Sequence, residues 1–376
     1  MTSSLIGLLP YLYYFTAIIL AFVLKLATPL TLKKSSVKRT KHAIGIAAGP
    51  KGWQSNELKE LYTSAVEYFG KAHVYKLYVD RSKPHAPQLD SFIRQYQITH
   101  FIFDPRAWRQ ESDQNYFNAL SDSLAILRVL IIHGVVPLGY LTDISFRIWR
   151  SQAAVVTSLN GIVVTFAHPK PFQHIFPHSR ILGPSIMPFS IKTLNKIKSR
   201  KNELIRLRKI SNVVRFVGSL YEPRISFLNQ FKTIMGTRAD IQGRSFGSER
   251  QPEYQYWDSI ASAAIVITTA EQVIRPGFDL SSVNQLVYRY LEVMAADSLL
   301  LAPWVMGMER YFVPGVDFVV FSDLNDACKK AHYYLDRPDE ARKISKSGHA
   351  KASALINCHA FWLQADAALS IKGFFS

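Results

Sequence analysis

The chain has 376 residues, enough for two domains of ordinary size, and hydrophobic residues make up 48% of it, so sizeable cores can form. The formal net charge of +17 predicts acidic partners such as nucleic acid, anionic lipid or phosphorylated substrates. Neither zinc-finger spacing nor an RNP-like signature supports nucleic acid. The two cysteines, Cys328 and Cys358, have neither metal-ligand spacing nor a disulfide framework.

The first feature in chain order is an uncharged apolar run over residues 5–24. At about 1.5 Å per residue it is just long enough to cross a hydrocarbon core. Basic residues follow it from Lys25 to Lys41, whereas residues 1–4 carry none, so the positive-inside rule places the rest of the chain on the cytoplasmic face. We predict an N-terminal hydrophobic membrane-anchor helix with a basic flank over residues 1–41, either single-pass or monotopic. The alternative is a helix that packs on the protein.

From His42 onward the sequence alternates between short apolar runs and helical patterns. This βαβα rhythm predicts an α/β domain over residues 42–188, with a parallel sheet covered by helices on both faces. The predicted strands are 43–48, 73–79, 100–103, 135–141, 155–157 and 162–166, and the predicted helices are 57–69, 89–96 and 116–132. In such sheets ligands bind at the carboxyl ends of the strands.

That rule singles out polar residues that follow strands in this first domain. Asp143 follows strand 135–141, where a carboxylate could take a proton from an acceptor hydroxyl, or could instead cap a helix near residues 146–150. Asp104 and His168 also follow strands, and His168 could equally be a turn residue before Pro169. The glycines after the first strand do not form G-x-G-x-x-G, so dinucleotide binding is not indicated.

A Pro- and His-rich connection over residues 169–188 leads to a strongly basic helix. In the connection, Pro177 separates His174 from His178 and no carboxylate lies nearby in sequence, so no metal site is predicted. The basic helix, residues 191–209, lies within a predicted linker over 189–211. It either presents a solvated face or contacts an anionic membrane surface.

The second predicted domain, 212–376, opens with a strand over 213–217 and a glycine-containing loop that leads into a helix. A helix N-terminus after such a loop is a ready anion site, so Gly218 and Arg224 are predicted to bind a diphosphate. The alternative is that Gly218 only turns the chain. The further predicted elements are helices over 225–235, 254–261, 325–334 and 340–361 and a strand over 263–268.

Helical spacing over residues 285–296 is followed by a short apolar run, 298–302, and a loop over 304–315 that ends in Pro-Gly. Arg289 and Glu292 are three residues apart, so they lie on one face of this helix. An arginine can neutralise a diphosphate, and a glutamate can accept both hydroxyls of a ribose. The alternative is a surface ion pair on an ordinary helix.

Three spaced segments carry a resemblance to a known family. They read R-Y-L-E-V-M-A-A-D-S-L-L-L-A-P, then E-R-Y-F-V-P-G-V-D-F-V-V-F-S-D-L-N-D-A, then Y-Y-L-D-R-P-D-E-A-R-K-I-S-K-S-G-H. Together they resemble the C-terminal domain of group-1 glycosyltransferases, in the branch that includes spore-maturation-type enzymes. The resemblance spans residues 212–368. It implies a GT-B fold of two Rossmann-like domains, with a final helix over 364–369 that crosses back to the first domain.

The resemblance also marks further candidate residues and two departures. Asn284 stands where the family often has the first of two acidic residues, with Glu292 as the second. An asparagine can bond a sugar hydroxyl but carries no charge. Asp297 stands where the family usually has glycine, and aspartate tolerates the left-handed conformation that a tight turn requires. Glu309, in the loop before Pro314, is a candidate sugar contact.

The resemblance therefore implies a glycosyltransferase that moves a sugar from a nucleotide-sugar donor to a membrane-associated glycan or lipid-linked acceptor. No metal or other cofactor is predicted, because Arg224 and Arg289 can neutralise the leaving diphosphate and no D-x-D follows a strand. Nucleic acid is not a predicted partner. The alternatives are a sugar-nucleotide epimerase or hydrolase on the same fold and a membrane-bound scaffold that has lost the chemistry.

Overall fold

The computed structural model describes residues 19, 23, 43–48, 56–103, 116–141, 161–170, 180–245, 251–269, 284–369 and 371. The chain divides into two compact units. Unit 1 comprises residues 1–185, 274–281 and 361–376, and unit 2 comprises residues 186–273 and 282–360. The basic helix lies within unit 2, and residues 361–369 belong to unit 1.

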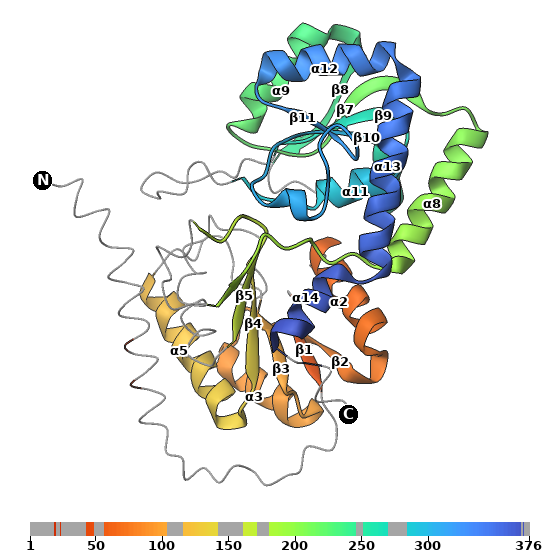
Figure 1. Ribbon diagram of the computed structural model, residues 1–376. Helices are drawn as coiled ribbons and strands as arrows, with labels where there is room; N and C mark the ends of the chain where they lie inside the picture. The colour runs from red at the N-terminus through yellow and green to blue at the C-terminus, as the bar shows by residue number, and fades with distance from the viewer. Residues whose placement is uncertain are drawn as a thin grey trace, which may run out of the picture. The chain divides into compact units, whose positions relative to one another are not determined.

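Unit 1 is built on a six-stranded parallel sheet with the order β2-β1-β3-β4-β5-β6 (Figure 1). The strands are β1 (Ile44–Ala48), β2 (Val74–Tyr78), β3 (His100–Phe103), β4 (Val136–Leu141), β5 (Ile162–Thr165) and β6 (Ile181–Leu182), and the helices are α2 (Asn56–Phe69), α3 (His85–Tyr96), α5 (Tyr116–His133) and α14 (Ala360–Leu369). The predicted α/β parallel architecture is confirmed. The two-residue β6 was not predicted, because it lies in the Pro-rich connection.

The core of unit 1 follows from strands whose residues are apolar on both faces. All four residues of β5 are buried, as expected for a parallel strand that is covered on each side. The C-terminal helix α14 packs on α2, where the Trp362 indole is fully buried and donates a hydrogen bond of 2.9 Å to Ser64 Oγ. Tyr68 on α2 donates a second bond of 2.9 Å to Asp366. The last helix is therefore an integral part of unit 1.

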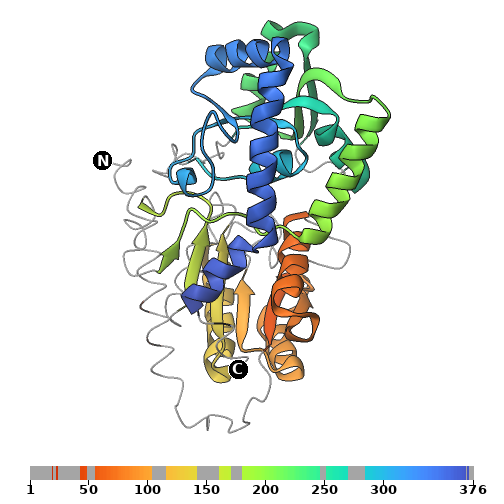
Figure 2. The same cartoon turned by 45° about the vertical axis from the view of Figure 1, so that its right-hand side comes forward.

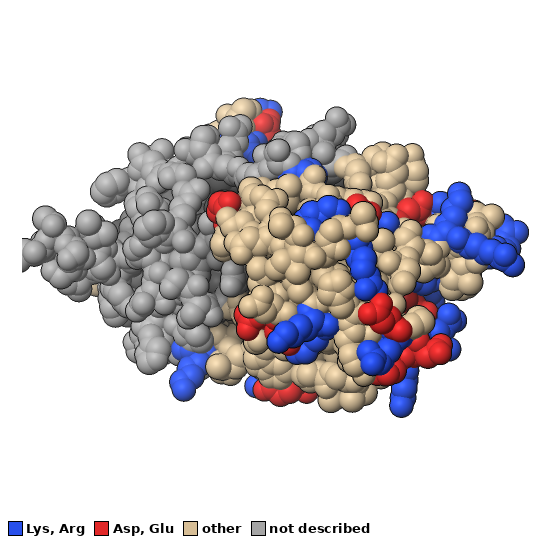
Figure 3. All heavy atoms as spheres, turned by 90° about the horizontal axis from the view of Figure 1, so that it is seen from above, with Lys and Arg blue, Asp and Glu red and all other residues tan. Residues whose placement is uncertain are grey.

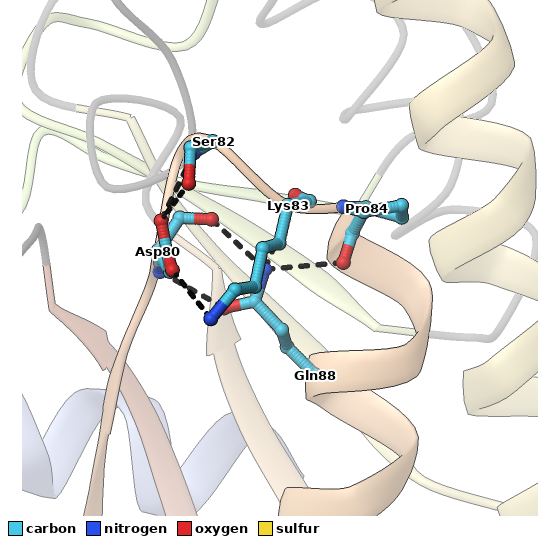
Figure 4. A network of polar contacts seen from close by, with 5 residues as sticks. All are labelled: Asp80, Ser82, Lys83, Pro84 and Gln88. Carbon is cyan, nitrogen blue, oxygen red and sulfur yellow. Dashed lines mark hydrogen bonds and ion pairs between the residues drawn. The ribbon is translucent and has the colours of Figure 1, made fainter.

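The loop from β2 to α3 is held by a small polar network (Figure 4). The Asp80 carboxylate accepts bonds from the backbone and hydroxyl of Ser82 and pairs with Lys83 at 3.0 Å, and these contacts lower the pKa of Asp80 to about 2. Gln88 closes the network, since its amide accepts from Asp80 N and donates to Asp80 O, both at 2.9 Å. The start of α3 is thereby fixed to the carboxyl end of β2.

Unit 2 contains a five-stranded parallel sheet with the order β11-β10-β9-β7-β8. The strands are β7 (Ser211–Leu220), β8 (Ala239–Ser245), β9 (Ala263–Ile267), β10 (Leu299–Pro303) and β11 (Val319–Phe321), and the helices are α8 (Ile191–Arg206), α9 (Arg224–Met235), α10 (Glu253–Ala261), α11 (Arg289–Ala295), α12 (Leu324–Asp336) and α13 (Pro338–Asn357). Figures 1 and 2 both show α8 beside the long helix α13. Strand β8 was not predicted, because its sequence is largely polar and it lies at the sheet edge.

Two predicted helices differ from the structure. The helical spacing from Gln285 gives a helix that begins only at Arg289, because residues 284–285 form bridges and Tyr288 is the N-cap. The predicted helix over 340–361 is two helices, α13 and α14, separated at Cys358 and His359. His359 has a left-handed φ of 51°, which ends α13 and starts the segment that belongs to unit 1.

The tight turn between α11 and β10 is linked to a buried lysine. Asp297 has a φ of 50°, so the predicted left-handed turn is confirmed at this residue. Lys201 on α8 is 8% exposed, and its ammonium donates to the Ala261 carbonyl at 2.8 Å and to Ser298 Oγ at 3.3 Å. Burial lowers the pKa of Lys201 to about 8, against the opposing attraction of Asp297.

Lys201 should make stability depend on pH in the alkaline range. Between its folded pKa of about 8 and its ordinary value of 10.5, the unfolded chain holds a proton that the folded chain has released, so stability rises with pH. We expect the free energy of unfolding of the wild type to rise by about 3 kcal/mol across this window relative to Lys201→Met. Denaturant unfolding at several pH values measures it, and parallel pH profiles for the two proteins would contradict it.

The predicted anchor over residues 5–24 lies outside the described residues apart from Ile19 and Val23. No helix in the described part of the chain combines the length and the apolar character needed to span a membrane.

Candidate functional site

The candidate site lies in unit 2, where the strand order reverses. Strand β7 has β8 on one side and β9 on the other, so chain connections leave β7 and β9 in opposite directions. Such a switch point opens a place for a ligand beyond the carboxyl ends of the two strands. Residues Gly218–Leu220 end β7, and the buried Thr268 and Thr269 follow β9. Gly218, predicted from its loop, is thus at the switch point.

Arg224, the first residue of α9, lies against this edge. Its Nε donates to Thr269 Oγ1 at 2.8 Å and its Nη1 to the Ser219 carbonyl at 3.0 Å, so it bridges the ends of β9 and β7. Its guanidinium carbon is 4.2 Å from the centre of the Tyr221 ring. Burial lowers the pKa of Arg224, Tyr221 opposes that shift, and the positive charge of Arg289 adds to it. In the described part of the chain, no carboxylate pairs with Arg224.

Arg289, the first residue of α11, is brought to the same place from a distant part of the sequence. Its side chain is 14% exposed and lies over the Tyr256 ring at 5.0 Å, with Nη1 3.5 Å from Glu292 Oε2. A Cβ atom at position 218 would lie 3.5 Å from Arg289 Nη2, an ordinary van der Waals distance, so the guanidinium lies beside the β7 backbone at Gly218. Burial disfavours the charged form, but Tyr256 and Glu292 outweigh it and raise the pKa of Arg289.

Glu292 is 2% exposed and already has partners within the protein. The Tyr256 hydroxyl donates to its Oε2, the same oxygen that faces Arg289. Arg289 and Glu292 lie on one helix face, as predicted, and the ion pair between them is buried, unlike the surface pair of the alternative. Contact between Glu292 and a ribose stays a prediction. Tyr256 was not predicted as a site residue, because a tyrosine on an amphipathic helix gives no sign in sequence of which side chain it will meet.

Helix α11 is held in place by α13. His349 Nδ1 lies 3.1 Å from the Met294 carbonyl and 3.0 Å from the Ala295 carbonyl, which are among the last carbonyls of α11. As a donor it satisfies groups that a helix C-terminus leaves without an intrahelical partner. Position 348 is also tight, since a Cβ there would lie 2.2 Å from the Asp317 carbonyl oxygen. The G-H pair within the S-K-S-G-H segment therefore positions the helix that carries Arg289 and Glu292.

Replacing His349 with alanine should loosen α11. We expect the free energy of unfolding to fall by about 1–2 kcal/mol, because two buried carbonyls lose their donor, together with weaker binding of nucleoside diphosphates. Chemical denaturation and calorimetry measure the two effects. Lys351→Ala, an exposed change on the same helix, is the control. Unchanged stability in His349→Ala would show that the imidazole does not cap α11.

The other two predicted donor-binding residues, Asn284 and Glu309, lie in loops of unit 2. Asn284 donates to the Trp304 carbonyl at 3.1 Å, so it links the segment before α11 to the loop after β10. Glu309 is exposed on the short 3-10 helix η3 (Met308–Arg310) of that loop. Among the described residues, neither forms a hydrogen bond or an ion pair with Arg224 or Arg289.

Of the three candidate residues in unit 1, the structure describes His168. Asp143 and Asp104 lie outside the described residues. His168 is described, and its Nδ1 accepts a bond of 3.2 Å from the backbone of Lys170, which favours the turn interpretation. In the described part of the chain, no group of three or more His, Cys, Asp or Glu residues could hold a metal ion.

Comparison with known proteins bears on the family and the fold. Residues 222–364 match the family described as glycosyl transferase-like. The fold is similar to that of Alr3699/HepE from Anabaena, solved with UDP and glucose, with 12% identity, a TM-score of 0.55, and coverage of 88% of this chain and 99% of that chain. Sucrose-phosphate synthase from Thermosynechococcus elongatus is similar at 14% identity and a TM-score of 0.51, covering 89% of this chain and all of the other.

A putative UDP-N-acetylglucosamine 2-epimerase from Listeria monocytogenes shares the fold at 8% identity and a TM-score of 0.50, covering 89% of this chain and 96% of that chain. No curated protein matches the chain significantly. At these identities the similarities show the fold, which is the GT-B arrangement of two Rossmann-like domains. Together with the family match over residues 222–364, this fold supports the resemblance to group-1 glycosyltransferases.

Proposed function

We propose that this glycosyltransferase takes its sugar from a nucleoside-diphosphate donor bound at the carboxyl edge of the unit 2 sheet. The observation that supports this most is the meeting of Arg224 and Arg289 from separate helices beside Gly218. Among the described residues, Arg289 pairs with the carboxylate of Glu292 and Arg224 pairs with none, so this cluster carries an excess positive charge where the switch-point rule expects a ligand. A diphosphate would supply the missing negative charge.

In this proposal the arginines act in the step that breaks the bond between sugar and diphosphate. As the leaving diphosphate gains negative charge, guanidiniums already held in place stabilise it without reorganising. Arg224 is held by Thr269 and Ser219, and Arg289 by Tyr256 and Glu292. Glu292 would bind the ribose, Asn284 and Glu309 the sugar, and Asp143 would receive the proton of the acceptor hydroxyl.

The donor and acceptor are the finer part of the proposal. Because Alr3699/HepE has been solved with UDP-glucose, UDP-sugars are the first donors to test. We propose a membrane-associated glycan or lipid-linked acceptor at the cytoplasmic face. The support is the apolar run over residues 5–24 with its basic flank, together with the net charge of +17.

The test is a calorimetric screen of the purified protein against the uridine, guanosine, adenosine, thymidine and cytidine diphosphates and their sugars. We expect one diphosphate to bind well and to bind more weakly to Arg289→Ala and Glu292→Ala. If a well-folded protein binds none of them, the scaffold alternative gains and the donor proposal fails. Of the two departures from the family pattern, Asp297 no longer favours a scaffold, because it adopts the left-handed conformation that the turn requires. Asn284, which carries no charge, still favours a scaffold.

The second alternative is a sugar-nucleotide epimerase, because a putative epimerase has a similar fold. A test of turnover distinguishes it from a transferase. An epimerase would convert a UDP-sugar with no acceptor present, whereas a transferase requires the acceptor for turnover. Product analysis of donor incubated with and without membrane extract separates the two.

A further inference from the structure

The basic helix α8 uses much of its charge inside unit 2. Arg200 pairs with both Asp258 and Glu203, Lys196 lies 3.9 Å from Glu253, and Lys201 is buried. These contacts join α8 to α10, the helix that carries Tyr256. One face of the middle of α8 therefore packs on α10 within unit 2, so only part of the charge of this helix is available to a partner.

The end of α8 is different. Residues 205–210, with the sequence I-R-L-R-K-I, are all exposed, and we call them the α8 tip. Ile205, Leu207 and Ile210 have exposed fractions of 43%, 45% and 38%. Figure 1 shows the α8 tip at the outer edge of unit 2, and Figure 3 shows a group of Lys and Arg side chains protruding at the corresponding edge.

The backbone of the α8 tip has a defined shape. Lys209 N donates to the Leu204 carbonyl at 2.9 Å and Arg208 N to the Ile205 carbonyl at 3.0 Å, the paired bonds of a Schellman helix end. Arg208 occupies the left-handed position with a φ of 53°, where glycine would be favoured by roughly 1 kcal/mol. The turn thus fixes the backbone positions that carry these cations and aliphatic side chains, at a conformational cost.

The helix end itself explains only some of the cations and aliphatic side chains of the α8 tip. Positive charge at a helix C-terminus is favourable, which explains some of the cations. It does not explain three exposed aliphatic side chains among them. In the described part of the chain, no carboxylate pairs with Arg206, Arg208 or Lys209, and no acidic residue occurs between Glu203 and Glu222. The α8 tip therefore offers both charge and apolar surface to a partner.

We propose that the α8 tip docks unit 2 on an anionic lipid surface. Cations interleaved with aliphatic side chains suit the boundary between headgroups and acyl chains. Single-stranded nucleic acid would instead favour aromatic side chains for stacking, and the tip has none. The inference deepens the proposed function and rests on its membrane acceptor, because docking would hold the donor-binding unit next to that acceptor.

The experiment uses the full-length chain with an environment-sensitive fluorophore one helical turn before Arg206. Asn202→Cys is labelled in a Cys358→Ser background, which leaves only the buried Cys328. Vesicles of phosphatidylcholine with phosphatidylglycerol should shift the emission to the blue, and pure phosphatidylcholine should not. The same label on exposed Asn229 of α9 is the positional control, and it should respond to neither vesicle.

Charge and apolar surface are then removed separately. The triple variant Arg206→Gln, Arg208→Gln and Lys209→Gln should raise the half-maximal vesicle concentration by on the order of 100-fold. The matched control, Lys343→Gln, Lys346→Gln and Lys351→Gln, loses the same charge from exposed positions of α13 and should bind as the wild type does. The apolar variant Ile205→Ser, Leu207→Ser and Ile210→Ser should abolish the blue shift of the label.

Three results would overturn the docking proposal. These are an equal response to neutral vesicles, an equal loss in the α13 control, or a stronger response to RNA or polyglutamate than to anionic vesicles. Failure of the proposed function is distinguishable, because diphosphate binding is measured without lipid and should be the same in the α8 tip variants as in the wild type.

Discussion

Arg289→Ala is expected to lower sugar transfer by roughly 100- to 1,000-fold, the range found when one preorganised donor to a developing charge is removed. The structure explains why the effect should be large. Arg289 is only 14% exposed, lies over the Tyr256 ring, and approaches the β7 backbone at Gly218, so water cannot easily replace it. Calorimetry with the best nucleoside diphosphate and initial rates at saturating donor separate weaker binding from slower chemistry.

A loss of stability could imitate this result. Without Arg289, the carboxylate of Glu292 stays 2% exposed and lacks its ion-pair partner, which costs about 3–5 kcal/mol at buried sites. The double variant Arg289→Met with Glu292→Gln removes both charges together. It should regain most of the stability of the wild type and still fail to bind the diphosphate.

Two further variants complete the test. Arg289→Lys keeps the charge but not the planar fork, so it should retain part of the binding. Arg238→Ala, which removes an arginine paired with Asp336 at a different place in unit 2, should leave activity unchanged. Wild-type diphosphate affinity in a folded Arg289→Met/Glu292→Gln protein would sink the proposed role.

The second large effect is expected at Gly348. Alanine there should lower the free energy of unfolding by about 3 kcal/mol, at the upper end for an added methyl group in a packed interior. The new Cβ would lie 2.2 Å from the Asp317 carbonyl oxygen and 3.2 Å from Met294 Cγ. The Asp317 backbone cannot yield readily, because its carboxylate accepts bonds from Val313 N at 2.9 Å and Ser347 Oγ at 2.8 Å.

Helix propensity alone predicts the opposite change in the free energy of unfolding for Gly348→Ala, so the direction of the change tests the close contact. In a helix without close neighbours, glycine to alanine stabilises by about 1 kcal/mol. Ala350→Gly, at an exposed position of the same helix, is the control and should cost about that amount by propensity alone. Guanidinium unfolding of both variants measures the effects. A Gly348→Ala protein as stable as the wild type would show that α13 and the Asp317 loop are not in close contact.

The sequence by itself determined the class of fold and much of unit 2. Apolar runs and helical patterns in alternation predicted parallel sheets, because a strand buried on both faces must be apolar throughout and needs a helical crossover to its parallel neighbour. The three-residue spacing of Arg289 and Glu292 predicted that they share a helix face, because this depends only on helix geometry. The left-handed turn at Asp297 was predictable for the same reason, since it is a local backbone property.

Only the tertiary structure decided what these residues meet. Arg224 and Arg289 are far apart in sequence and come together because the sheet order reverses beside β7. Tyr256 reaches Glu292 from α10, and His349 reaches the end of α11 from α13, by packing that no local pattern encodes. The basic helix likewise read as uniform, and packing divided it into a face bound to α10 and an exposed tip, because burial depends on neighbours and not on composition.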